Sequence, residues 1–194
     1  MNSASRYFWP LLIFVAFVQT AALFKIVYDK DRLLKSGREI TLPVKPVDPR
    51  DIFRGDYVTL GYDISSLNAS QVPAGSFDKF AIGAPAYVTV APNPAGGWAV
   101  TSVSPEFPKS VSPADVVLKA RVDRMWRGQS GSDGVLSLRY GIETYFVPEG
   151  TGRVLESKVR EHKIDAILAV GADGSAALKG LVVDGERHVD PPLL

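Results

Sequence analysis

The densest cluster of side chains that could do chemistry lies in the loop over residues 47–56 and the segment directly after it. Carboxylates suit hard cations such as Ca²⁺ or Mg²⁺, and guanidinium groups suit carboxylate or phosphate anions. The same side chains also cap turns and pair with one another, which is a structural role. No EF-hand spacing is present, so we expect the structural role and no metal or cofactor. The cluster consists of Asp48, Arg50, Asp51, Arg54, Asp56 and Asp63.

The element that positions this cluster is a predicted strand directly after the loop. Apolar side chains alternate with mostly polar ones there, which is typical of a half-buried strand with one face on a core. Gly55 and Asp56, just before the strand, supply a turn or bulge where φ can be positive. The inward face is predicted to carry Val58, Leu60, Tyr62 and Ile64, and the outward face Tyr57, Thr59, Gly61 and Asp63.

The same segment carries a resemblance to a known family. Its spacing G-D-Y-x-x-L-x-Y-x-I resembles the signature of a bacterial family named after that string, whose members are small membrane-anchored proteins of unknown function. Chain length, an apolar N-terminal segment and residues 171–185 are similar too. Members are encoded near multi-spanning membrane proteins, so the resemblance implies a partner of that kind. The candidate interaction residues are Arg54, Gly55, Asp56, Tyr57, Leu60, Tyr62 and Ile64.

Composition narrows the classes of protein. The chain has 194 residues, 46% of them hydrophobic, and a net charge of +1, so no global field attracts nucleic acid, and we expect no nucleic-acid partner. It has no cysteine, which excludes disulfides, thiolate nucleophiles and cysteine-based metal sites within this sequence.

The N-terminal apolar segment is predicted to anchor the chain in a membrane. No charged residue occurs from Tyr7 to Phe24, and a helix of that length spans roughly 27 Å, close to the hydrocarbon thickness of a bilayer. We expect Pro10 in the first helical turn. The predicted segments are a cytoplasmic N-terminus over 1–6, an anchor over 7–28 and a helical stalk over 29–37.

The sequence leaves two interpretations open for the cleavage of this anchor and two for its orientation. Small residues at Thr20-Ala21-Ala22 are compatible with a cleaved signal peptide, although the apolar segment is longer than a usual signal core and continues past that point. Cationic residues are more numerous after the segment than before it, which by the positive-inside rule would place the body in the cytoplasm. The family resemblance instead implies an inner-membrane, single-pass protein with a periplasmic body.

The body shows weak internal repetition. Leu60, Tyr62 and Ile64 recur as Leu138, Tyr140 and Ile142, all 78 residues further on. Three other segments recur in the same order at offsets of 73 to 80. One of them is a predicted hairpin over 87–100, which recurs as a predicted hairpin over 167–178. These matches predict a duplication.

Short runs broken by Gly and Pro predict a mainly β body, a compact sandwich or barrel-like arrangement, with one short helix over 151–162. We expect a β-rich first half over 38–104, a proline-rich connection over 105–115 and a β-rich second half over 116–190.

Other candidates for chemistry are weaker. His162 and His188 lie in no metal or nucleophile motif, and no G-x-S-x-G elbow is present. Aromatic residues on the strands could line a ligand groove, but packing in the core is the simpler interpretation. They are Tyr57, Tyr62, Trp98, Trp126, Tyr140, Tyr145 and Phe146.

We therefore expect a non-enzymatic interaction module that acts with another membrane protein, and this hypothesis predicts an exposed apolar patch or an unpaired strand edge. The alternative is a cell-envelope hydrolase or carbohydrate-binding enzyme that uses carboxylates near Asp56.

Overall fold

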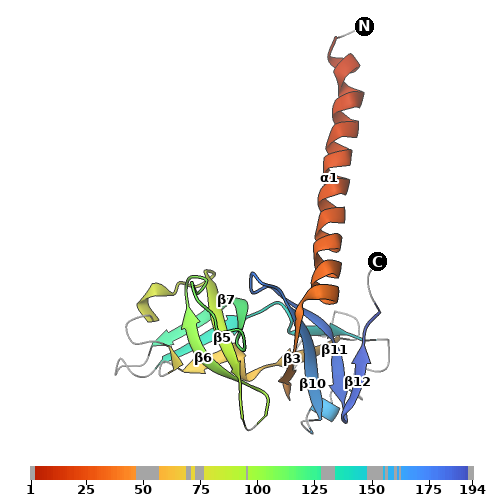
Figure 1. Ribbon diagram of the computed structural model, residues 1–194. Helices are drawn as coiled ribbons and strands as arrows, with labels where there is room; N and C mark the ends of the chain where they lie inside the picture. The colour runs from red at the N-terminus through yellow and green to blue at the C-terminus, as the bar shows by residue number, and fades with distance from the viewer. Residues whose placement is uncertain are drawn as a thin grey trace.

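The computed structural model describes residues 3–46, 57–68, 71–72, 77–94, 96–127, 134–147, 155, 157–159, 161 and 163–191. One long helix stands on a body of β-strands that forms two lobes side by side (Figure 1). The predicted fold class, mainly β with an N-terminal apolar helix, is confirmed.

The helix α1 (Ser3–Ser36) runs without a break through the predicted anchor and stalk. From Tyr7 onward it is long and apolar enough to cross a membrane. Its start at Ser3 places Pro10 inside the helix, so the expectation of a first-turn proline is wrong: helical structure extends into the polar residues before the apolar segment.

The foot of α1 is tied to the body. The Gly37 N–H donates to the Leu33 carbonyl at 2.8 Å, which ends the helix. A Cβ on Gly37 would lie 2.6 Å from that carbonyl oxygen, so this close approach needs glycine. On the stalk, ion pairs at i,i+4 spacing join Lys25 to Asp29 and Lys35 to Asp31.

Lobe 1 is a five-stranded antiparallel sheet that curls into a half-barrel. Short helical turns η1 (Asp63–Ser65) and η3 (Phe77–Lys79) flank it. The strand order is β4 (Ser66–Asn68), β8 (Gly134–Arg139), β7 (Val116–Arg127), β5 (Pro85–Pro92) and β6 (Trp98–Ser104).

Lobe 2 lies under α1 and contains two adjoining antiparallel sheets. The first has the order β1 (Arg38–Pro43), β10 (Ile164–Val170), β11 (Ala176–Val183) and β12 (Glu186–Val189). The second has the order β2 (Lys45–Pro46), β3 (Tyr57–Gly61) and β9 (Thr144–Phe146). Only Val44 separates β1 from β2, so the two sheets continue one another.

The pairing registers of the two lobes repeat at the offset seen in the sequence. In lobe 2 Thr59 pairs with Thr144, and in lobe 1 Ser137 pairs with Ser66. Positions 59 and 66 of the first repeat correspond to positions 137 and 144 of the second, because each pair of positions differs by 78. The two pairings are therefore equivalent, and each joins a strand of one repeat to a strand of the other. The neighbouring pairs follow the same rule, so β3 and β4 of the first repeat correspond to β8 and β9 of the second.

The repeats exchange strands between lobes. Strand β4 belongs to the first repeat but pairs with β8, and β9 belongs to the second repeat but pairs with β3. Likewise β1 pairs with β10, and β7 pairs with β5. The boundaries 38–104 and 116–190 therefore do not divide the chain into separate sheets, because each sheet takes strands from both segments. The segment 105–115 between them contains no helix or strand.

One hydrophobic core extends through both lobes, because the exchanged strands share it. Leu60, Leu118 and Leu168 are fully buried members of the same cluster, although they come from different sheets. Burying one such side chain stabilises the fold by about 1.5–3 kcal/mol. Of the predicted helix over 151–162, the structure describes helical residues at 155 and 157–159, with Val159 buried.

Candidate functional site

The described part of the signature segment, residues 57–64, builds the junction of the two lobes. Its predicted alternation of burial is confirmed: Val58, Leu60, Tyr62 and Ile64 are buried, whereas Asp63 is exposed. The predicted strand is too long, because β3 ends at Gly61 and the helical turn η1 follows from Asp63. Arg54, Gly55 and Asp56 lie outside the described residues, as do Asp48, Arg50 and Asp51 of the acidic loop.

Two tyrosines of the repeated motif bond reciprocally across this junction. The Tyr62 hydroxyl donates to the Ile142 carbonyl at 2.9 Å, and the Tyr140 hydroxyl donates to the Ile64 carbonyl at 2.7 Å. Each bond therefore runs from the tyrosine of one motif copy to the isoleucine of the other. We call this pair of hydrogen bonds the tyrosine clasp.

Glu143 braces the clasp from the second copy. Its carboxylate accepts hydrogen bonds from the backbone N–H groups of Tyr140 and Gly141, and its own carbonyl accepts one from the Leu60 N–H at 2.8 Å. The carboxylate thus organises the turn after β8, where Gly141 has a φ of 79°. Sequence reasoning missed Glu143, which has no counterpart in the first copy.

The environment of the clasp keeps both phenols neutral. Burial raises the pKa of Tyr62 and of Tyr140 well above its usual value, and the nearby Glu143 charge raises each further. A phenol that holds its proton this firmly serves as a hydrogen-bond donor to a carbonyl. The repeated half of the motif is therefore structural.

The remaining sequence candidates are spread over the molecule. Asp63 pairs with Lys45 at the surface. His188 is exposed on β12, and His162 lies outside the described residues. Across the described residues, no group of three His, Cys, Asp or Glu side chains could hold a metal ion.

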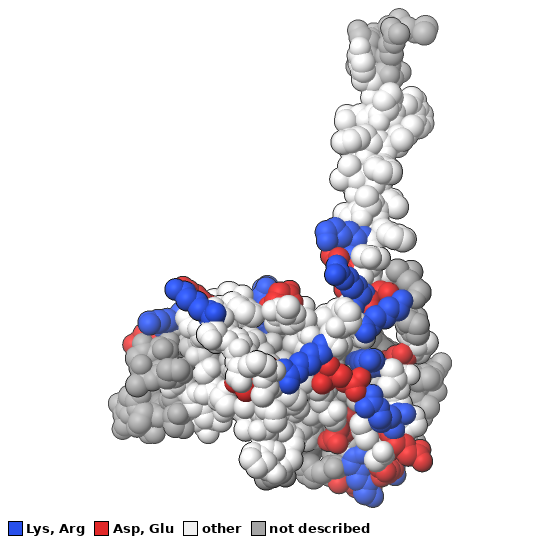
Figure 2. Space-filling view, in the orientation of Figure 1, with Lys and Arg blue, Asp and Glu red and all other residues white. Residues whose placement is uncertain are grey.

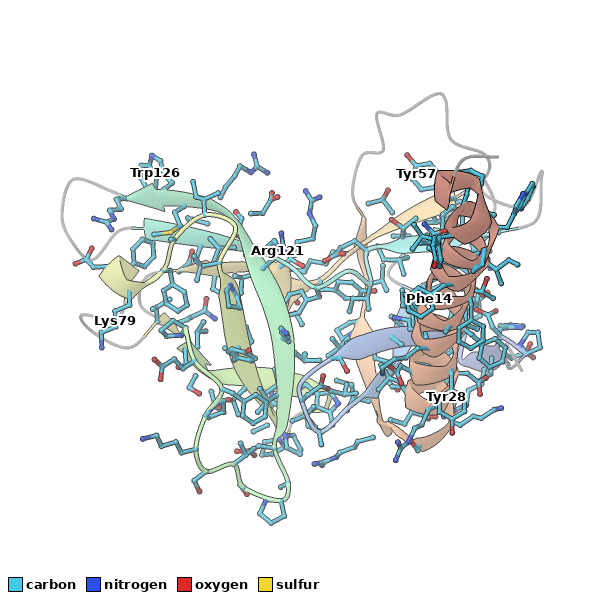
Figure 3. All side chains as sticks on the ribbon, turned by 90° about the horizontal axis from the view of Figure 1, so that it is seen from above. Phe14, Tyr28, Tyr57, Lys79, Arg121 and Trp126 are labelled. Carbon is cyan, nitrogen blue, oxygen red and sulfur yellow. The ribbon has the colours of Figure 1, made fainter. Side chains whose placement is uncertain are left out.

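The aromatic residues also separate rather than line one groove. Tyr57 and Phe146 pair across β3 and β9 with ring centroids 6.4 Å apart. Trp126 is 60% exposed on lobe 1, away from Tyr57 (Figure 3). The Tyr145 hydroxyl donates to Asp190 at 2.8 Å, and burial, followed by this bond, raises the pKa of Tyr145 to about 12.

A groove of about 620 Å³ lies at the foot of α1, between the helix, β10 and the connection over 105–115. Arg38 lines this groove, but its guanidinium donates to the carbonyls of Pro113, Ala114 and Asp115 at 2.6–2.8 Å and lies over the Trp98 ring. The guanidinium is therefore engaged in holding the connection against the body. Among the described residues that line the groove there is no pair of carboxylates and no nucleophile with a base.

The outer edges of the two lobes differ in chemistry. Strand β6 ends the sheet of lobe 1, and no described strand pairs with its outer side. Its sequence, Trp-Ala-Val-Thr-Ser-Val-Ser, contains no charged residue. In lobe 2 the corresponding hairpin strand β11 is covered by β12, which carries Glu186, Arg187 and His188. Charged or covered edges resist pairing with other chains, whereas an uncharged open edge favours it.

Comparison with curated proteins and with solved structures gives no match. A family model described as "GDYXXLXY protein" matches residues 19–181. The match covers the C-terminal half of α1, the signature segment, the clasp, the hairpin β5–β6 and the hairpin β10–β11 up to Leu181, which is well over half of the chain. The protein is therefore a member of the GDYXXLXY protein family.

Proposed function

We propose that this protein is a membrane-anchored, non-enzymatic interaction module whose body acts outside the cytoplasm on another membrane protein. The observation that carries the proposal is the open edge of β6. An extended segment of a partner adds to such an edge by forming the main-chain hydrogen bonds that the sheet leaves unmade.

Several features of β6 support strand addition. Ala99 and Thr101 are exposed, while Val103 near the end of the strand is buried in the core and holds the strand in place. No side chain of the strand carries a charge that would repel an incoming strand. The surface around β5 and β6 is also mostly uncharged (Figure 2).

The anchor limits where the partner is found. An apolar helix that spans a bilayer keeps the body within a short distance of the membrane surface, where the local concentration of other membrane proteins is high. A multi-spanning partner with an extended loop on the same side of the membrane fits this geometry. The stalk adds about 1.5 Å per residue, so the reach is short.

The partner test uses photo-crosslinking in native membranes. A photoreactive amino acid at Ala99 or Thr101 should give a discrete adduct with a membrane protein, and the same amino acid at Glu186 on β12 serves as the matched control. Adding Thr101→Lys to the Ala99 probe should abolish the adduct, because a lysine disfavours edge pairing. Equal labelling from both strands, or none from β6, contradicts the proposal.

The signature loop is tested in the same membranes. Affinity purification of the intact chain and of a chain substituted over 55–57 shows whether Gly55, Asp56 and Tyr57 take part in the contact. A reporter fused after Leu194 reads out the side of the membrane that the body occupies. Reporter activity of the cytoplasmic type would contradict the extracytoplasmic location.

A further inference from the structure

A second surface of lobe 1 has a different character from the β6 edge. Near the end of β7 and its neighbours, cationic side chains surround two exposed apolar ones. We call this surface the β7 patch; it consists of Ile82, Arg121, Arg124, Trp126 and Arg139.

Strand pairing and one backbone hydrogen bond place the members of the β7 patch along one stretch of β7 and β8. Arg121 and Arg139 are directly opposite on β7 and β8, and Trp126 is opposite Val135, five residues further along β7. The Gly83 N–H donates to the Val122 carbonyl at 2.8 Å, which brings the loop with Ile82 beside β7. These side chains therefore share one region of the surface.

Positive charge is in excess on this surface. Asp123 forms ion pairs with both Arg139, at 2.9 Å, and Arg124, at 3.6 Å. The neighbouring Arg127 forms an ion pair with Asp78. Arg121 forms no ion pair with a described residue. Two arginines directly opposite on neighbouring strands repel each other unless an anion lies between them. Because the whole chain has a net charge of only +1, this excess is local.

The apolar members are unusual for a solvated sheet face. Trp126 is 60% exposed and Ile82 is 70% exposed. Tryptophan beside Lys and Arg is the composition found at membrane–water interfaces, where the indole sits among headgroups and the cations meet lipid phosphates.

The direction of α1 bears on which side of the body faces the bilayer. In the view from above, α1 runs from Tyr28 past Phe14 toward Tyr57 of lobe 2, and Trp126 lies on the same side of the body, at the far end of lobe 1 (Figure 3). The helix therefore leans over that side. Holding α1 near the membrane normal, where spanning helices lie on average within about 20°, raises that side relative to the opposite one.

From the charge, the exposed indole and the lean of α1, we infer that the β7 patch contacts the anionic headgroups of the membrane that α1 spans. The contact holds the body against the bilayer, so that the body is attached to the membrane at this surface as well as through α1. It uses a surface other than β6, so it does not depend on the proposed partner.

The test uses full-length protein in nanodiscs, with Trp9→Phe and Trp98→Phe so that Trp126 is the only tryptophan. Headgroup-nitroxide lipid should quench Trp126 in discs that contain phosphatidylglycerol, and much less in discs of phosphatidylcholine alone. Quenching should fall at 1 M salt, where the Debye length is about 3 Å.

Charge variants separate this contact from general electrostatics. Arg121→Gln with Arg124→Gln should weaken docking roughly twenty- to thirtyfold, because each cation near an anionic surface contributes about one factor of five. The matched control is Lys109→Gln with Lys163→Gln, which removes the same charge elsewhere and should leave quenching unchanged. Absence of quenching in anionic discs, or quenching insensitive to salt and to the Arg121/Arg124 change, overturns the inference.

Discussion

The two lobes use the same strand arrangement but differ at their borders. Both place the motif strand next to a strand exchanged from the other repeat. Lobe 2 adds β12, the foot of α1 and a group of ion pairs, whereas lobe 1 leaves β6 open and carries the β7 patch. The duplicated framework therefore builds the body, and features outside it give each lobe its own surface.

Strand exchange also predicts how the body unfolds. A lobe cannot unfold alone without leaving exchanged strands of the other lobe unpaired, because each sheet takes strands from both repeats. The single hydrophobic core has the same consequence. We therefore expect one cooperative transition for the body, and the following changes test how equal the two lobes are.

The largest effect should come from the repeated leucine. Leu60→Ala and Leu138→Ala should each lower the free energy of unfolding by about 2–5 kcal/mol, because both side chains are buried at equivalent positions. Urea unfolding of the full chain in detergent, followed by near-ultraviolet circular dichroism, measures this loss. Ile82→Ala, at an exposed position, is the control. Two separate transitions, only one of them shifted, would show that the lobes are independent.

Gly180→Ala should weaken the pairing of β12 with β11, so that β11 becomes an open edge like β6 of lobe 1. A Cβ at Gly180 would lie 2.1 Å from the His188 carbonyl oxygen, so β12 must move away from β11. We expect a loss of about 1–3 kcal/mol and faster hydrogen exchange in β11. Ala99→Val enlarges a side chain on the open edge of β6 and should change little. Unaltered exchange in β11 would mean that β12 accommodates the methyl group.

The two hydrogen bonds of the tyrosine clasp should contribute equally to the free energy of unfolding. Tyr62→Phe and Tyr140→Phe should each cost about 1–2 kcal/mol, because each leaves a buried carbonyl without its donor. Tyr57→Phe, at a half-buried position on the opposite face of the strand, should cost much less. A double-mutant cycle measures whether the two bonds support each other. A large cost at one tyrosine and none at the other would contradict the symmetry.

Alkaline pH should weaken the body through the same tyrosines. Their folded pKa values are raised, so stability is unaffected below the unfolded pKa of about 10. Above it, the unfolded chain loses these protons while the folded chain keeps them, and the free energy of unfolding falls by about 1 kcal/mol per tyrosine at pH 11. Denaturation of the Tyr62→Phe/Tyr140→Phe variant between pH 8 and 11 should show a shallower decline. An identical decline would assign the effect to other groups.

The smallest effect should come from the ion pairs that only lobe 2 has. Glu39 pairs with Arg187 at 2.7 Å and with Lys179 at 3.1 Å, and its hydrogen bonds to Arg187 and then Lys179 lower its pKa. This stabilisation is present above the unfolded pKa near 4.5 and is lost as pH falls through the lower folded value. Because the group is partly exposed, Glu39→Gln should cost only about 0.5 kcal/mol at pH 7. Glu106→Gln, in the connection that follows β6, is the control, and an equal loss there would remove the distinction.

Local patterns in the chain were sufficient for much of the fold. The uncharged run from Tyr7 to Phe24 predicted a helix able to span a membrane, because a bilayer requires a fixed length of apolar residues. Alternation over residues 57–64 predicted which side chains face the core, because successive side chains of a strand point to opposite faces. The two predicted hairpins are present as β5–β6 and β10–β11.

The candidate site was less predictable. The Tyr-x-Ile repeat was visible in the sequence, but its meaning depended on contacts between residues about 80 positions apart. Glu143 had no recognisable motif, since its function is to bond two backbone N–H groups of a turn. The open edge of β6 could not be predicted either, because an edge is defined by which strand does not pair with it.

Four features could therefore be predicted from the order of residues alone: the apolar helix, the mainly β body, the inward faces of the strands and the repetition of Leu-x-Tyr-x-Ile. These are properties of neighbouring residues and of hydrophobic periodicity. Three other features became visible only in the folded chain: the exchange of β4 and β9 between the repeats, the tyrosine clasp and the open edge of one lobe. Those features depend on long-range pairing, where many strands of similar composition compete and packing in the shared core selects among them.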